Sequence, residues 1–297
     1  MSSRRHFLHT ALGAGAAASV LAAPSKLSYR GENIEFGLVT YMWGADWDLP
    51  TLIKNCEASQ VHAVELRVEH AHKVDVSLTP EQRAEVRSRF EDSPVDVLGM
   101  GTNFEFHSPD AEELKKNIAG AKQFIKLSHD IGGTGVKVKP NALPKDVPVD
   151  KTLAQIGKAL AEIGDYALGF GQEIRLEVHG KETSNLDHIR TIMEAAARDN
   201  VRVCWNSNAE DLAGDGIEAN FAKVKDHLGR TVHIREVNTG DYPYDKLARL
   251  LVEADYEGFV CLEARTKPED RVKALAEQRE LFMNLVTAAR KELVKDE

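Results

Sequence analysis

Short runs rich in β-branched residues alternate along the chain with longer stretches whose apolar residues recur at helical spacing. This alternation is typical of parallel βα units, in which a helix connects each strand to the next. The segments that fit a buried strand are Ile34–Tyr41, Val61–Arg67, Val95–Gly101, Gly135–Lys139, Glu173–His179, Val201–Asn206, Thr231–Glu236 and Gly258–Ala264. Eight such units predict an α/β fold, the (β/α)8 TIM barrel. The alternative, a doubly wound open sheet, normally has a G-x-G-x-x-G turn, and none follows the first strand.

Three of the intervening segments have a clear helical pattern. We expect helices over Ala111–Ile131, over Thr152–Phe170 and from Pro268 to about Val294, the last of which closes the barrel. Asp110 and Asp150 stand at the starts of the first two and are predicted to cap them.

The chain has 297 residues, which suits one large barrel. We find no internal repeat and no Pro- or Ser-rich linker within it. The prediction is therefore a single TIM-barrel domain over residues 34–297, preceded by a short linker over residues 24–33.

The first residues resemble an export signal. Ser3-Arg4-Arg5-His6-Phe7-Leu8 matches the twin-arginine motif, and an uncharged Ala/Gly-rich stretch follows from Thr10 to Ala23. This stretch is too short and too weakly apolar to span a bilayer comfortably. We expect residues 1–23 to be a signal peptide read by the twin-arginine translocase, which exports folded proteins. The mature protein would then be periplasmic or extracellular.

Charge and cysteine content narrow the function classes. The formal net charge is −9, and removing Arg4 and Arg5 with the signal peptide leaves −11. Such an acidic body argues against nucleic acid as a partner. The three cysteines, Cys56, Cys204 and Cys261, have no disulfide or zinc spacing, so we expect free, buried thiols.

Polar residues occupy alternate positions near the carboxyl ends of the predicted strands. Because side chains alternate across a strand, one set faces the helices and the other faces the barrel interior. The predicted inward set is Glu65, Arg67, Lys137, Lys139, Glu177, His179, Cys204, Asn206, His233, Arg235, Phe259, Cys261 and Glu263. Charged groups inside a barrel are costly unless they are paired, hydrated or bound to a metal. Their convergence on one mouth predicts an active site there.

Four of these residues form a candidate metal site: Glu177, Asn206, His233 and Glu263. Two carboxylates, an imidazole and an amide oxygen suit Mn2+, Mg2+, Co2+ or Fe2+ better than a structural zinc. Such an ion can polarise a carbonyl group, and a carboxylate beside it can move a proton on the neighbouring carbon through an enediolate.

The motifs around these residues resemble the sugar phosphate isomerase/epimerase superfamily, the xylose-isomerase-like barrels. They are Leu176-Glu177-Val178-His179, Trp205-Asn206-Ser207-Asn208, Val232-His233-Ile234-Arg235 and Leu262-Glu263. The resemblance implies that Glu177, Asn206, His233 and Glu263 bind one divalent metal ion. It also implies that the two glutamates exchange the substrate proton and that His179 contacts substrate, which makes these three the catalytic candidates.

One departure from this family pattern keeps alternatives open. The sixth-strand ligand is usually Asp with a His shortly after, whereas here Asn206 is followed by Asn208 and no His. The leading hypothesis is a metal-dependent sugar isomerase or epimerase. The alternatives are a lyase or hydrolase of 3-keto-glycosides on the same metal site, and an exported sugar-binding barrel without catalysis. An endonuclease barrel would need more His and carboxylate ligands than this chain assembles.

The substrate is expected to be a small sugar or keto-sugar. The residues predicted to bind it are Lys137, Lys139, Arg235, Glu65, Trp43 and His107. Many barrels of this kind pair, so the sequence leaves a homo-oligomer open.

Overall fold

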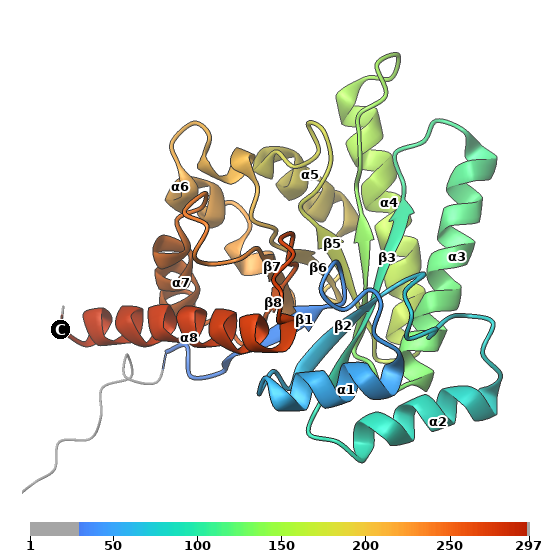
Figure 1. Ribbon diagram of the computed structural model, residues 1–297. Helices are drawn as coiled ribbons and strands as arrows, with labels where there is room; N and C mark the ends of the chain where they lie inside the picture. The colour runs from blue at the N-terminus through green and yellow to red at the C-terminus, as the bar shows by residue number, and fades with distance from the viewer. Residues whose placement is uncertain (1–29, 296–297) are drawn as a thin grey trace, which may run out of the picture.

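Eight parallel strands form a nearly closed barrel with helices around it (Figure 1). The computed structural model describes residues 30–295, and the predicted signal peptide lies outside the described residues. The strands are β1 (Ile34–Val39), β2 (Ala63–Arg67), β3 (Asp96–Glu105), β4 (Gly135–Lys139), β5 (Glu173–Glu177), β6 (Val201–Cys204), β7 (Thr231–Ile234) and β8 (Gly258–Leu262). All eight predicted strands are present, and the predicted TIM barrel is confirmed.

The strands follow the order β6-β5-β4-β3-β2-β1-β8-β7, so the sheet closes between β6 and β7. Isolated parallel bridges join Val203 to Leu228 and Asn206 to His233 across this seam. The His233 amide donates a hydrogen bond to the Trp205 carbonyl oxygen at 2.7 Å. The closure therefore holds Asn206 beside His233.

The sequence prediction extends five strands too far at their carboxyl ends. β1, β5, β6, β7 and β8 each end two residues before the predicted position. The alternation of side chains continues in extended backbone after the ladder of hydrogen bonds stops, so the pattern alone does not mark the last paired residue. By contrast, β3 continues to Glu105, with a register shift against β4 after Gly101.

The helices cover the outside of the barrel, and α8 returns beside β1 (Figure 1). They are α1 (Leu49–Ala58), α2 (Pro80–Glu91), α3 (Ala111–Asp130), α4 (Val149–Leu168), α5 (Leu186–Ala196), α6 (Ile217–Ala222), α7 (Tyr244–Glu253) and α8 (Arg271–Lys295), with 3-10 turns at Ala209–Leu212 and Lys225–His227. Asp110 caps α3 as predicted, because its carboxylate accepts from the Glu112 and Glu113 amides. The predicted Asp150 cap is wrong: Pro148 precedes α4, which places Asp150 inside the first turn.

Two groups of apolar side chains form the core. The larger group packs the outward faces of the strands against the helices. The smaller group, Val39, Ala63, Leu98, Phe259 and Cys261, comes from the alternate positions of β1, β2, β3 and β8 and therefore fills the barrel interior. Cys56, Cys204 and Cys261 are free and buried, as predicted.

A glycine lets β3 approach β4 closely. Gly99 has φ +133°, and a Cβ added there would lie 1.9 Å from the Gly135 carbonyl oxygen. The register between β2 and β3 shifts at this point, between Val64 and Glu65. Only a residue without a side chain fits this bulge.

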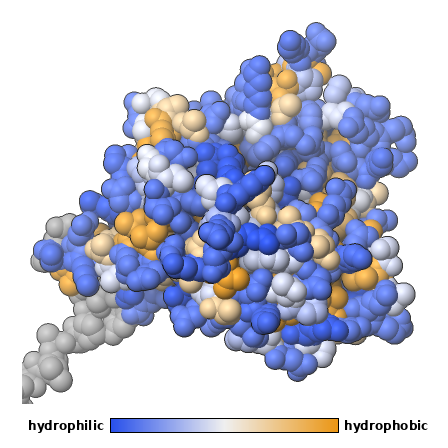
Figure 2. Space-filling view, in the orientation of Figure 1, coloured by the Kyte–Doolittle hydropathy of each residue, from blue (hydrophilic) through white to orange (hydrophobic). Residues whose placement is uncertain are grey.

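The surface seen in Figure 2 is mostly hydrophilic, and hydrophobic residues on it are scattered. The large apolar side chains that are exposed in the described part of the chain are Val149, Leu168, Leu212, Leu281 and Val294. Among the described helices, none is both long and apolar enough to cross a membrane.

Candidate metal centre and active site

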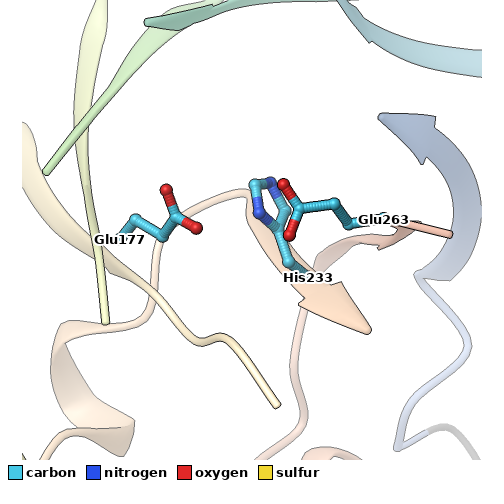
Figure 3. Close-up of side chains that lie close together, drawn as sticks. All are labelled: Glu177, His233 and Glu263. Atoms are coloured by element: carbon cyan, nitrogen blue, oxygen red, sulfur yellow. The ribbon is translucent and has the colours of Figure 1, made fainter. Parts of the chain in front are cut away.

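Glu177, His233 and Glu263 come together at the carboxyl ends of three strands (Figure 3). Glu177 ends β5, His233 lies in β7, and Glu263 directly follows β8. One ligand atom from each lies within 4.8 Å of the other two, and all three side chains are buried. In Figure 3 the two carboxylates and the imidazole ring point toward one another.

Glu65 contacts His233 in the barrel interior, beneath the mouth. The Nε2 atom of His233 lies 3.4 Å from the carboxylate oxygens of Glu65, and both side chains are completely buried. The Nδ1 atom of His233 is also buried and has no hydrogen-bond partner among residues 30–295. Burial lowers the pKa of His233, but Cys204 and Glu65 raise it, and the net direction is upward. A carboxylate on one ring nitrogen commonly orients a histidine that ligates a metal through the other.

Both carboxylate oxygens of Glu177 accept hydrogen bonds. The Lys137 Nζ atom lies 2.6 Å from Oε2, and the two charged groups have exposed fractions of 0% and 2%. The Asn206 amide nitrogen donates to Oε1 at 2.9 Å. Burial raises the pKa of Glu177, but the positive charges of Lys137, His233, His179 and Lys139 together outweigh it and hold this pKa well below its usual range. Glu177 is therefore a fixed, ionised carboxylate.

Glu263 differs from Glu177 in its surroundings. Its side chain is 7% exposed and forms no hydrogen bond or ion pair with the described residues. Its backbone amide donates to the Ile234 carbonyl oxygen at 2.8 Å, which fixes the chain where β8 ends. Glu263 is thus the carboxylate of this pair that is free to act on a ligand.

These residues fit one divalent cation. Two carboxylates, an unpartnered imidazole nitrogen and the Asn206 amide oxygen are the donors that hard or borderline divalent ions accept. The buried, orphaned Nδ1 atom of His233 is the structural sign of a missing partner, because buried polar atoms are nearly always satisfied.

A network of hydrogen-bonded polar residues lies beside the mouth. The His179 Nδ1 atom lies 2.8 Å from the Asn141 amide oxygen, and the Asn141 nitrogen donates to Glu105. His107 lies next in this chain, with its Nδ1 atom 3.7 Å from the Glu105 carboxylate. Burial lowers the pKa of His179, which favours the neutral imidazole. The predicted residues His179 and His107 thus share one network.

Three residues predicted to bind substrate interact with other residues of the protein. Glu65 lies deep in the barrel against His233 rather than at the mouth. Trp43 is 2% exposed, and its indole nitrogen donates to the Thr266 carbonyl oxygen, so it joins the loops after β1 and β8. Arg235 is half-buried, and its charge acts on Asp211 and Tyr244.

The sequence interpretation assigned no role to Asn141 and Asp211, two polar residues near the mouth. Asn141 lies two residues beyond the inward Lys139, so a longer alternating pattern could have found it. Asp211 lies in a 3-10 turn that has no such pattern. Its Oδ2 atom accepts from the Asn208 amide and the Tyr242 hydroxyl, and burial raises its pKa to about 7.

A surface hollow also lies at the other end of the barrel. Its lining includes Arg87, Asp96, Thr134 and Arg230, which stand near the amino-terminal ends of strands. TIM-barrel active sites lie at the carboxyl ends, so the residues around Glu177 are the candidate site.

The family comparison agrees with this architecture. The model of the xylose isomerase-like TIM barrel family matches residues 53–285. The chain therefore belongs to the xylose isomerase-like TIM barrel family. No curated protein sequence matches it.

Solved structures share the fold at low sequence identity. An L-ribulose 3-epimerase is 16% identical with a TM-score of 0.76, over 88% of this chain and 97% of that one. The apo 3-keto-D-glucoside 4-epimerase from E. coli is 15% identical with a TM-score of 0.70, over 85% and 99%. A xylose isomerase-like TIM barrel protein from Mycobacterium smegmatis in complex with magnesium is 16% identical with a TM-score of 0.64, over 88% and 99%.

Proposed function

We propose that the protein is a metal-dependent sugar isomerase or epimerase that moves a proton on the carbon next to a carbonyl group. The observation that carries this proposal is the convergence of Glu177, His233 and Glu263, with Asn206 beside them, at the mouth of the barrel. Family membership and similarity to an L-ribulose 3-epimerase and a 3-keto-D-glucoside 4-epimerase support an enzyme of this broad kind. The donor set suits Mn2+, Mg2+ or Co2+.

Each residue has a distinct task in this mechanism. The metal ion, when bound, polarises the substrate carbonyl and stabilises the negative charge that develops on its oxygen. Glu263 accepts the proton from the neighbouring carbon, because its carboxylate is not engaged elsewhere. Lys137 and Asn206 keep Glu177 ionised and oriented. Glu65 orients the His233 ring, and His179 contacts a substrate hydroxyl group.

The hydrogen bonds of Glu177 also favour a second candidate, a lyase of 3-keto-glycosides. A two-base epimerase needs a mobile carboxylate on each face of the substrate, whereas Lys137 and Asn206 engage both oxygens of Glu177. One base is enough for elimination. Glu263 would take the proton from C2, beside the 3-keto group, and the bond from C1 to the aglycone oxygen would break. Addition of water to the resulting unsaturated sugar would complete a hydrolysis.

Product analysis tests both candidates. We would incubate the chain without residues 1–23, loaded with Mn2+, with free ketoses and with a 3-keto-glucoside, and identify the products by chromatography. An epimer or aldose supports the first candidate, and aglycone release supports the second. Glu263→Gln should abolish either activity, while Glu269→Gln, an exposed control on the adjacent loop, should keep it. Sugar-induced stabilisation without turnover, equal in wild type and Glu263→Gln, would instead support a binding protein.

We also propose export through the twin-arginine pathway, on the motif at Arg4 and Arg5. Replacing both by Lys should keep a fused reporter in the bacterial cytoplasm, where the wild-type leader delivers it to the periplasm. A reporter exported equally by both leaders would contradict this proposal.

A further inference from the structure

Lys139 and Arg67 are cations near the mouth whose charged groups make no ion pair with residues 30–295. The Lys139 ammonium group makes no hydrogen bond or ion pair with residues 30–295, although its side chain is half-buried. The Nε atom of Arg67 is buried and also lacks a partner in the described chain. The Arg67 guanidinium group lies 5.5 Å from the centre of the Tyr41 ring, which supports one of its faces and leaves its edge free.

A glycine of β3 lies beside Arg67 in the sheet. Arg67 ends β2 in register with Gly101 of β3, and Gly101 is in register on its other side with Lys137, two residues before Lys139 ends β4. A Cβ added to Gly101 would lie 3.1 Å from the Arg67 Cδ atom and 2.6 Å from a Glu65 oxygen. At the position in register with Arg67, β3 therefore adds no side chain that could cover the guanidinium group.

Two neighbouring carboxylates have other partners, and Glu263 acts on Lys139 through its charge alone. Glu105 pairs in register with Lys139 across the sheet, yet its carboxylate accepts from Asn141 and lies near His107. Glu177 is held by Lys137. Burial lowers the pKa of Lys139, and the positive charges of Lys137 and Arg67 lower it further. The ammonium group thus sits where an added negative charge would be stabilised.

A bound divalent ion increases this imbalance. Its two positive charges would neutralise Glu177 and Glu263, which leaves Glu65 and Glu105 as the carboxylates that face Lys137, Lys139 and Arg67. Three cations would then face two carboxylates in a partly buried site, where the interaction of the excess positive charge with an anion is stronger than in water.

From this charge arrangement, we infer that the substrate carries an anionic group, which Lys139 and Arg67 bind at the mouth between β2 and β4. The substrate class is a keto-sugar acid, with its carboxylate on the Arg67 edge, rather than a neutral ketose. A guanidinium edge matches a carboxylate or a phosphate by two parallel hydrogen bonds. This inference rests on the proposed function for the identity of the sugar, but not for the binding of the anion.

Matched ligands test the inference by binding alone. Calorimetric titration of the Mn2+-loaded protein, without residues 1–23, would compare D-fructose, D-fructuronate and D-fructose 6-phosphate, and then D-tagatose with D-tagaturonate. At least one acid should bind about tenfold or more tightly than its neutral partner, since a hydrogen bond to a charged group is stronger than one between neutral groups. Stronger binding of the uronates than of the phosphate supports the carboxylate class; the reverse order keeps the anion site but overturns the carboxylate.

Removing the charge at each of the two positions is a second test of the inference. Lys139→Met and Arg67→Met should each weaken binding of the acid about tenfold or more and leave the neutral sugar unaffected. Arg87→Met, on exposed α2, should change neither. Equal affinity for acid and neutral sugar, equal weakening of both, or binding of no acid would overturn the inference. Tight, charge-dependent binding without proton transfer would overturn the proposed function instead.

Discussion

Lys137→Met removes the cation from a buried ion pair while keeping a side chain of similar length. In the wild-type protein the Nζ to Oε2 distance to Glu177 is 2.6 Å, and neither group is appreciably exposed. Removing one partner leaves an uncompensated buried charge, which costs about 3–5 kcal/mol. The Asn206 amide still donates to Glu177, so we expect the lower part of this range, about 3 kcal/mol.

Urea denaturation at about pH 7 with a chelator present measures this loss of unfolding free energy. The double variant Lys137→Met/Glu177→Gln should recover most of it, because no charge is then left unpaired. Mn2+ should also recover part of the loss in the single variant, since its charge would replace the ammonium group beside Glu177.

The pH dependence gives an independent check on the same pair. The folded pKa of Glu177 lies below its value of 4.5 in an exposed chain, so its contribution is present above about pH 4.5 and lost as the pH falls toward the folded pKa. The difference between wild type and Lys137→Met should therefore shrink at acidic pH. A Lys137→Met protein within about 1 kcal/mol of wild type at pH 7, with a double variant no more stable, would refute the reasoning.

Three further predictions follow from the geometry. Burial raises the pKa of Asp211 to about 7 from 3.8, so its contribution to stability is full below about pH 4 and lost as the pH rises through 7; Asp211→Asn should flatten thermal stability across this window, and an unchanged slope would contradict it. Gly99→Ala should lower the free energy of unfolding by more than about 3 kcal/mol or prevent folding. Gly171 has φ +63° and no atom within 4 Å of an added Cβ, so Gly171→Ala should lower the free energy of unfolding by only about 1 kcal/mol. Equal losses in urea denaturation would argue against the close approach at β3. Asn206→Asp adds a negative ligand and should tighten Mn2+ binding about tenfold or more in calorimetry; an unchanged affinity would remove Asn206 from the ligand set.

Strand periodicity was enough to predict the barrel and the convergence at its mouth. Because alternate residues of parallel strands face one interior, Glu177, His233 and Glu263 could be placed together before any coordinates were known. The pattern could not show depth along the barrel axis, so it grouped Glu65 with the substrate-binding residues although it lies beneath His233.

Strand periodicity could not predict which side chains pair with one another or how the loops are folded. The strand pattern around an inward lysine is the same whether the lysine binds substrate or a carboxylate. Only the structure shows that Lys137 pairs with Glu177, whereas Lys139 makes no ion pair with the described residues. The Trp43 and Asp211 environments depend on loop conformations that follow no period. Asp150 was misassigned because α4 begins at Val149, directly after Pro148, so Asp150 is the second residue of the helix.

Solvent isotope exchange is a direct test of metal-dependent proton transfer at this mouth. We would incubate the Mn2+-loaded chain without residues 1–23 in D2O with ketoses, keto-sugar acids and a 3-keto-glucoside, and follow the spectra by NMR. The account predicts that deuterium enters the carbon beside the carbonyl group, and that chelation or Glu263→Gln stops it. No deuterium incorporation into any of these compounds, with metal shown to be bound, would contradict the account.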